Sequence, residues 1–191
     1  MGERSIDQAL VERAQQGDKT AFDLLVQKYQ SKIIQLAYRY VHDQDEAMDI
    51  AQEAFIKAYK ALGRFRGDSA FYTWIYRIAI NTAKNYLVAS SRRPPRSDIE
   101  AGEAEQYDSA AGLREYGTPE RMLLKEEIKE TIASAIENLP DDLRTAITLR
   151  ELEGMSYEEI AQAMECPIGT VRSRIFRARD AIDGKLKPLL D

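Results

Sequence analysis

Several residue types and motifs are scarce or missing in this sequence of 191 residues, and each absence excludes a class of protein. The chain has one cysteine, Cys166, so an internal disulfide is impossible. That cysteine and a single histidine, His42, leave no constellation of zinc ligands. No GxxxxGKS/T, GxGxxG or GxSxG motif is present. We therefore expect no metal, no nucleotide cofactor and no hydrolase nucleophile.

Long apolar runs are also missing. No stretch approaches the roughly 18 uncharged apolar residues that a membrane helix needs, and no basic-then-apolar leader opens the chain. The lone cysteine fits a reducing compartment. We expect a cytoplasmic protein that does not itself span a membrane.

The net charge of −5 hides a strong segregation of charge along the chain. Residues 64–96 carry seven bases and one acid, and residues 167–187 carry six bases and two acids. Between them, residues 97–117 carry six acids and one base. Two basic segments indicate two surfaces that meet phosphate, although a charge run alone is usually only a solvated surface. The positions of these basic residues on helices distinguish a phosphate-binding surface from a solvated one.

Hydrophobic periodicity predicts an all-α chain. Apolar residues at helical spacing indicate a helix that stops at Gly17, a second with Asp18 as N-cap, a third from about Asp43 to Leu62, and a fourth from a Ser69 cap to about Ser90. Residues 91–117 have the composition of a flexible acidic linker. Helicity resumes at Thr118-Pro119, with helices expected at about 119–138, 140–152, 156–164 and 170–187. The sequence thus predicts two small helical domains, 1–90 and 118–191, joined by the linker.

The last two predicted helices have the spacing of a helix-turn-helix. Ser156 and Glu159 form a capping box at the start of the first helix. Residues 165–169 form the turn, in which Glu165 takes a position usually held by glycine, and Thr170 is expected to cap the second helix. Cys166 in this turn is better explained as a small buried hydrophobe than as a redox switch.

The second helix of this pair divides into an apolar face and a polar face at 100° per residue. The face expected in the core holds Val171, Ile175, Ala178, Ile182 and Leu186. The opposite face holds Ser173, Phe176, Arg177 and Asp180, with Arg172 and Arg174 on its flanks. Arginine can chelate guanine in the major groove, so this pattern indicates a DNA recognition helix.

Aromatic and basic residues are interleaved in the first domain. Six of the 16 aromatics fall between Phe65 and Tyr86. A stripe of Trp74, Arg77, Asn81 and Lys84 lies beside the expected core face of the fourth helix. Rings beside cations suit unpaired bases, but core aromatics with surface charge explain the stripe equally well.

Several segments resemble extracytoplasmic-function sigma factors of the sigma-70 family, most of all the sigma-E-like envelope-stress branch. Residues 49–55 (DIAQEAF), 65–74 (FRGDSAFYTW) and 80–85 (INTAKN) resemble region 2 of that family. Residues 139–144 and 167–174 (PIGTVRSR) resemble region 4. The match spans nearly the whole chain in the family's order. It implies a non-enzymatic subunit of RNA polymerase that recognises stress promoters.

The resemblance also implies roles for residues. Docking on the beta-prime clamp of core polymerase is assigned to Asp49, Gln52, Glu53 and Phe55, and the beta flap is a second contact of the chain. Capture of the −10 element is assigned to Phe65, Thr73, Trp74, Arg77, Asn81 and Lys84. Recognition of the −35 element is assigned to Thr170, Arg172, Ser173, Phe176 and Arg177, with Arg150, Tyr157 and Arg174 nearer the phosphates. The family further implies a membrane-tethered anti-sigma factor and a chain that is monomeric when free.

Two other functions remain open from the residues alone. A dimeric repressor or activator would explain residues 140–187 but gives no purpose to Asp49–Phe55 or to the aromatic-basic stripe. A nuclease would need paired carboxylates with a His or Lys partner, and the sequence shows none. For Asp49, Gln52 and Glu53, which share one helix face, a solvated acidic surface is the default explanation without the family.

Overall fold

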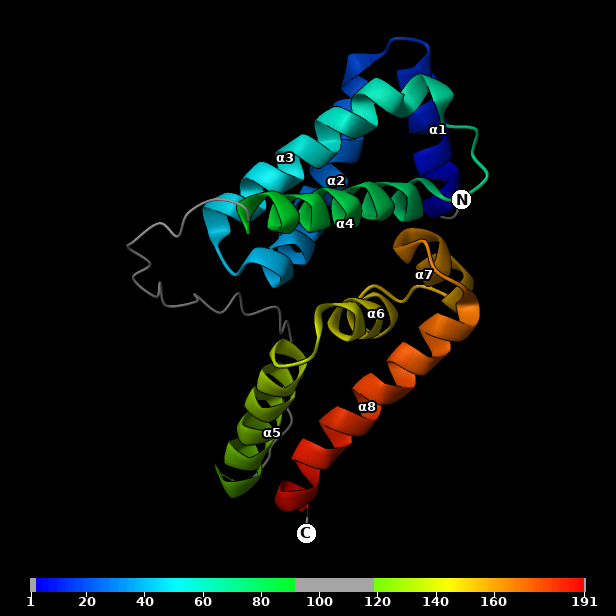
Figure 1. The fold of residues 1–191 in the computed structure, drawn as a ribbon. Helices are drawn as coiled ribbons and strands as arrows, with labels where there is room; N and C mark the ends of the chain where they lie inside the picture. The colour runs from blue at the N-terminus through cyan, green and yellow to red at the C-terminus, as the bar shows by residue number, and fades with distance from the viewer. Residues whose placement is uncertain (1–2, 92–118, 191) are drawn as a thin grey trace.

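The computed structural model describes residues 3–91 and 119–190, and within these ranges the chain is helical and has no strand. The first range holds α1 (Glu3–Gln15), α2 (Lys19–Val41), α3 (Gln44–Ala61), the 3-10 turn η1 (Leu62–Arg64) and α4 (Phe71–Ser90). The second holds α5 (Pro119–Glu137), α6 (Asp141–Glu151), α7 (Tyr157–Met164) and α8 (Ile168–Leu190), as Figure 1 shows. The expected all-α fold with two helical domains is confirmed.

Some expectations fall on the rest of the chain. Residues 92–117 of the expected linker, and Thr118 as the cap of α5, lie outside the described residues. The domain boundaries at 90 and 118 therefore stay predictions. Within the described ranges, no helix combines the length and apolarity that crossing a membrane requires.

Capping side chains set the first domain's helices in place. The Asp18 carboxylate accepts a hydrogen bond from the Ala21 amide at 3.2 Å, as the sequence predicts, after a turn at Gly17 with φ of 97°. Asp43 caps α3 in the same way, accepting from the Glu46 amide at 2.8 Å. The helices that start there turn their apolar faces toward α4. Leu25, Ile33, Ile50, Ile75 and Ile80 are buried in the shared core.

The start of α4 differs from the expectation. Ser69 is not its cap; the helix begins at Phe71, and Ala70 precedes it in an extended conformation without a side-chain cap. Phe71 and Trp74, in the first turn, are buried and within 5.8 Å of each other between ring centroids. Burial of these two rings fixes the first turn of α4 in place of a capping hydrogen bond.

The helix-turn-helix forms in the second domain. Both bonds of the Ser156–Glu159 capping box are present at the start of α7, and Glu165 ends that helix in the left-handed conformation. Thr170 is not the cap of α8, which begins at Ile168. The carbonyl of Pro167 accepts from the amides of Thr170 and Val171 instead, so the proline, with its fixed φ, sets the helix start. Val171 and Ile175 are buried, as their spacing predicts.

The two domains contact each other directly. In Figure 1, α6 and α7 lie against the first domain, whereas α5 and α8 extend away from it side by side. The contact is made mainly by α7 on α4, with a smaller contribution from α6 on α2. Two of the residues predicted to bind DNA on α4, Asn81 and Lys84, are bonded to the second domain.

Candidate partner-binding and nucleic-acid interfaces

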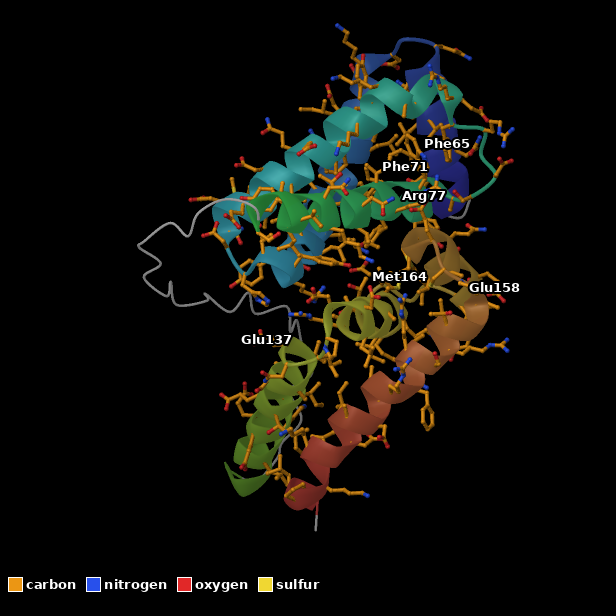
Figure 2. All side chains as sticks on the ribbon, in the orientation of Figure 1. Phe65, Phe71, Arg77, Glu137, Glu158 and Met164 are labelled. Carbon is orange, nitrogen blue, oxygen red and sulfur yellow. The ribbon has the colours of Figure 1, made fainter. Side chains whose placement is uncertain are left out.

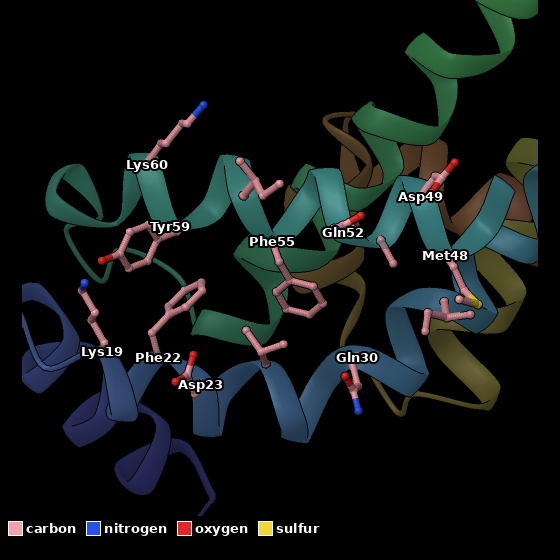
Figure 3. Close-up of a pocket in the computed structure, with 14 residues that line it drawn as sticks. Lys19, Phe22, Asp23, Gln30, Met48, Asp49, Gln52, Phe55, Tyr59 and Lys60 are labelled. Carbon is pink, nitrogen blue, oxygen red and sulfur yellow. The ribbon is translucent and has the colours of Figure 1, made fainter. Parts of the chain in front are cut away.

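A groove of about 750 Å³ runs between α2 and α3 on the surface of the first domain (Figure 3). Phe22 from α2 and Phe55 from α3 point into it. Met48, Ile56 and Tyr59, each about half exposed, line it along α3. Apolar side chains that gather in an exposed hollow mark a surface for another protein. The groove has the composition of a docking site.

Three of the four predicted docking residues line this groove. Asp49 and Gln52 are exposed along it, and Phe55 is buried at its base. Glu53 does not line it; its carboxylate pairs with the Lys57 ammonium at 2.7 Å on the neighbouring surface of α3. The periodicity of α3 placed all three polar residues on one face, but the groove admits only part of that face.

The α2 side of the groove was missed in the sequence. Val26 and Ile34 line it while remaining only half-buried. Their apolar spacing gave a signal, but it is the same signal that core residues give. Which apolar side chains remain partly exposed to solvent depends on the distance between α2 and α3, which the sequence does not show.

A second hollow, of about 390 Å³, opens where the loop after η1 meets the first turns of α4. It is lined by Arg64, Phe65, Arg66, Asp68, Ser69, Thr73, Trp74, Arg77 and Gln162. The centroid of the Phe65 ring lies 4.7 Å from that of Trp74, tilted by 36°. Trp74 is 8% exposed, which settles the question that the sequence left open: its indole belongs to the core and shows one edge to the hollow.

Thr73 is the most distinctive residue of this hollow. Its side chain is 1% exposed, and its hydroxyl has no hydrogen-bond partner among the described residues. A buried polar group left unpaired costs about 1–3 kcal/mol, so the Thr73 hydroxyl would gain from a polar partner in the hollow. Around it stand the guanidinium groups of Arg64, Arg66 and Arg77, of which Arg66 pairs with Asp68 at 3.1 Å on the surface.

Four of the six predicted −10 residues meet at this hollow. Phe65, Thr73, Trp74 and Arg77 line it, and Figure 2 shows Phe65 and Arg77 near the start of α4. Asn81 and Lys84 lie farther along α4 and reach the second domain instead. The Asn81 amide donates to the Glu165 carboxylate at 2.8 Å, and the Lys84 ammonium pairs with Asp142 at 3.1 Å.

Acidic side chains of the second domain face polar and basic side chains of the first along the whole contact. The Tyr72 hydroxyl donates to the Glu159 carboxylate, and Lys32 pairs with Glu153 at 3.0 Å. The hydroxyls of Tyr40 and Thr145 lie 2.6 Å apart. Burial raises the pKa of Tyr40 to about 12, an effect that the Thr145 hydrogen bond partly opposes. Polar and charged pairs thus cross the seam, beside buried apolar side chains of the two domains that belong to one cluster.

The exposed surface of α8 keeps the predicted recognition side chains available. Arg172, Ser173 and Arg177 are exposed, and Phe176 is 71% exposed. Thr170 is half-buried, and its carbonyl accepts from the Ser173 hydroxyl at 3.0 Å. Such an exposed aromatic ring between two arginines has no packing role within the described part of the chain. This side of α8 is open to a partner.

The three residues predicted nearer the phosphates are held within the second domain. Arg150 donates to the Met155 carbonyl at 2.7 Å, and its guanidinium lies 4.9 Å from the centre of the Tyr157 ring. Arg174 is 17% exposed and pairs with Asp142 at 2.5 Å. These contacts fix the direction of the two guanidinium groups, each of which has further N–H donors to offer.

Comparison of the chain with known proteins identifies its family. A family model described as sigma-70 region 2 matches residues 25–93, and one described as sigma-70 region 4 matches residues 129–182. The ECF RNA polymerase sigma-E factor of Escherichia coli K12 is 62% identical over 190 residues, 100% of this chain and 99% of that protein. The chain belongs to the extracytoplasmic-function sigma factors of the sigma-70 family.

Other relatives agree with this family. The RNA polymerase sigma-H factor of Pseudomonas aeruginosa is 66% identical over 184 residues, 96% of this chain and 95% of that protein. The sigma factor RpoE of Bartonella quintana, solved with the anti-sigma factor NepR, shares 25% identity and a TM-score of 0.62 over 87% of this chain and 96% of that one. CnrH, solved with the cytosolic domain of CnrY, shares the fold at 24% identity and a TM-score of 0.65 over 96% of this chain and 98% of that one.

The groove and the hollow fall largely within the region 2 match, and α6, α7 and most of α8 fall within the region 4 match. Sigma factors are transcription initiation factors and not a family of catalytic enzymes. The sigma factor interpretation of the sequence therefore holds, and the repressor and nuclease interpretations lose their support.

Proposed function

We propose that this sigma factor docks on core polymerase through the α2–α3 groove, captures the −10 element at the hollow beside α4, and reads the −35 element with α8. It would direct the polymerase to envelope-stress promoters and begin their melting. The observation that carries the proposal is the hollow, where a buried unpartnered hydroxyl lies beside a phenylalanine ring and three arginines.

The hollow suits one base flipped out of the duplex. Extruding a base costs a few kcal/mol, and stacking on an aromatic side chain returns about 1–3 kcal/mol. Phe65 supplies the ring, and the Thr73 hydroxyl supplies a hydrogen bond to a base edge. Arg64, Arg66 and Arg77 would neutralise the neighbouring phosphates. Asn81 and Lys84 would hold the strand farther along α4.

The exposed side of α8 suits duplex DNA. Arg172, Ser173 and Arg177 would contact base edges in the major groove, where one bidentate arginine–guanine pair is worth about 1–3 kcal/mol of discrimination. Thr170 and Phe176 flank these residues on the same helix. Arg174, Arg150 and Tyr157, already held in direction, would meet phosphates and so set the register of α8.

The α2–α3 groove suits the beta-prime clamp of core polymerase. Its apolar side chains would bury against the clamp, and Asp49, Gln52 and Phe55 would contact it from α3, with Glu53 at the edge. An acid beside apolar residues selects a basic partner surface and speeds the encounter. The second domain would contact the beta flap.

The two reading surfaces cannot serve together in the arrangement that the structure shows. A promoter spacer of about 17 base pairs is roughly 58 Å long at ~3.4 Å per pair. In the structure α7 contacts α4, and Asn81 and Lys84 are bonded to the second domain. Core polymerase would therefore have to hold the domains apart, and the free chain would be a weak, monomeric DNA binder.

Control by an anti-sigma factor belongs to the same proposal. The sigma factor of Bartonella quintana was solved with such a partner. A membrane-tethered protein of this class would cover both domains and keep this cytoplasmic sigma factor from the polymerase. The finer features of this control, including the membrane tether, rest on the family resemblance.

The test is co-purification with core polymerase followed by run-off transcription from a candidate envelope-stress promoter. We expect a one-to-one complex and transcripts that require both core and this chain. The free chain should show no nanomolar, sequence-specific binding to promoter duplex at physiological salt. Tight specific binding without polymerase, or core that initiates equally well without the chain, would contradict the proposal.

A further inference from the structure

Helix α1 contacts the loop that forms one side of the hollow beside α4. Gln8, Val11 and Gln15 lie on one side of α1, at spacings of three and four residues. Val11 is buried in the core, so it anchors this side of the helix against the domain. The two glutamines then extend toward the segment between α3 and α4.

Gln15 makes the decisive contact. Its side-chain nitrogen Nε2 donates to the carbonyl oxygen of Leu62 at 2.9 Å and to that of Phe65 at 2.8 Å. One amide group has two N–H donors, and both are used here. The Leu62 carbonyl also accepts from the Phe65 amide at 3.0 Å at the end of η1, so Gln15 adds a second hydrogen bond there and a further one to the Phe65 carbonyl. Gln15 thus closes the end of η1 from outside.

A second side chain of α1, that of Gln8, lies near the loop at Gly67. Gly67 has φ of +77°, a conformation that glycine adopts without strain. A Cβ placed there would lie 3.9 Å from the amide nitrogen and oxygen of Gln8. Gln15 therefore holds the segment at Leu62 and Phe65, and beyond Arg66 the Gln8 amide lies near Gly67.

The segment held in this way forms one side of the hollow. Arg64, Phe65 and Arg66 all line it, and the Phe65 ring is tilted against Trp74. The Phe65 carbonyl is itself an acceptor of Gln15, so the hydrogen bond fixes the backbone from which the ring projects. Stacking of a base on Phe65 requires that the position and orientation of the ring are fixed.

We propose that Gln15 is a positioning residue for strand capture. Its two hydrogen bonds hold the loop so that the Phe65 ring faces an unpaired base of the −10 strand. The inference rests on the proposed function and adds a residue outside the segments that resemble the family's motifs. Gln15 itself does not touch DNA; it acts through Phe65.

The test uses holoenzyme assembled from core polymerase and full-length variants. Gln15→Leu removes both donors, and Gln15→Glu keeps the shape while offering only acceptors to two carbonyls. Gln16→Leu is the matched control, because Gln16 is exposed next to Gln15 and makes no side-chain hydrogen bond within the described part of the chain. Binding of a single-stranded −10 oligonucleotide and the rate of open-complex formation on duplex promoter are measured.

We expect both Gln15 variants to weaken oligonucleotide binding and slow opening by about tenfold, which corresponds to about 1.4 kcal/mol. Their affinity for core polymerase and their melting temperature should match those of Gln16→Leu. In a Phe65→Ala background, Gln15→Leu should add no further defect, because a residue that acts through Phe65 has nothing left to position. A loss that is purely structural would instead lower core binding and stability as well.

The outcomes separate this inference from the function beneath it. If Phe65→Ala is defective but Gln15→Leu and Gln15→Glu behave as the unchanged chain does, the positioning role is wrong and the hollow keeps its function. Additive defects of Gln15→Leu and Phe65→Ala also overturn the positioning role. If Phe65→Ala itself captures the strand normally, the proposed function of the hollow fails and the inference fails with it.

Discussion

Glu165 shows how a single residue can carry a conformational cost for the sake of a contact. It sits at φ of 51° and ψ of 47°, in the turn between α7 and α8. The left-handed conformation costs a residue with a Cβ roughly 1 kcal/mol, and glycine avoids this cost. Glycine, however, has no carboxylate to accept the Asn81 amide from α4. The position therefore couples the turn of the second domain to α4 of the first.

The backbone part of that cost can be measured by itself. Glu165→Gly and Glu165→Ala both remove the contact with Asn81, but only glycine relieves the left-handed backbone. We expect the glycine variant to be more stable than the alanine variant by about 1 kcal/mol in the free energy of unfolding, measured by urea denaturation. Equal stabilities would mean that the turn relaxes to another conformation when the carboxylate is removed.

The sequence predicted side-chain directions well where a helical wheel applies. Val171 and Ile175 are buried and Arg177 is exposed, as their spacing requires. Trp74 could not be placed in the same way, because an aromatic residue beside a core face can turn either inward or outward. Its ring packs against Phe71 and against Phe65, which comes from a loop whose path no periodicity describes.

At the scale of elements, helix starts were predictable only where a side chain caps them. In the sequence, Asp18 and the Ser156–Glu159 capping box predict the starts of α2 and α7. The start of α4 is set by the burial of aromatic rings and that of α8 by the Pro167 carbonyl, so the serine and threonine expected there were the wrong signals. The α2–α3 groove was not predictable at all, because its width depends on the distance between two helices.

The polar edge of that groove gives a prediction for α3. Asp49→Arg should weaken the affinity for core polymerase by about tenfold or more, since it sets a positive charge against a basic partner surface. Gln52→Ala should weaken it less, because it removes a neutral contact only. Asp49 and Gln52 are both exposed, so the helical content and melting temperature of the variants should stay the same.

The matched control for this prediction is Glu12→Arg, the same charge reversal at an exposed residue of α1 that does not line the groove. Binding to core is measured by competition with the unchanged chain. If Asp49→Arg and Glu12→Arg bind core equally well, the groove is not the docking surface.

At the scale of the molecule, the sequence indicated two domains but not that they meet. The sequence assigned Glu159 to a capping box and Glu165 to the turn, and nothing in the spacing of these acids or of Asp142 shows that each finds a partner on α4. The structure places them against Tyr72, Asn81 and Lys84, respectively. The acids of the second domain occupy the surface where, in our proposal, the −10 strand binds. Opening the seam and binding the strand are then parts of one event.

In our proposal the two domains read different promoter elements in different states, one as duplex and one as single strand. Arg177 is exposed on α8 and should contribute about 1–3 kcal/mol of recognition at duplex −35 DNA. Asn81 lies on the α4 surface and should act only after the strands part. A template with a mismatched −10 bubble supplies the unpairing energy in advance and therefore separates the two roles.

Run-off transcription by Arg177→Ala and Asn81→Ala holoenzymes, on duplex and on bubble templates of the same promoter, separates the two roles. We expect Asn81→Ala to be slow on the duplex and at least partly restored on the bubble. Arg177→Ala should keep its defect on both templates, because the −35 element is duplex in each. If the bubble restores Arg177→Ala as fully as Asn81→Ala, the division of roles between the two domains is wrong.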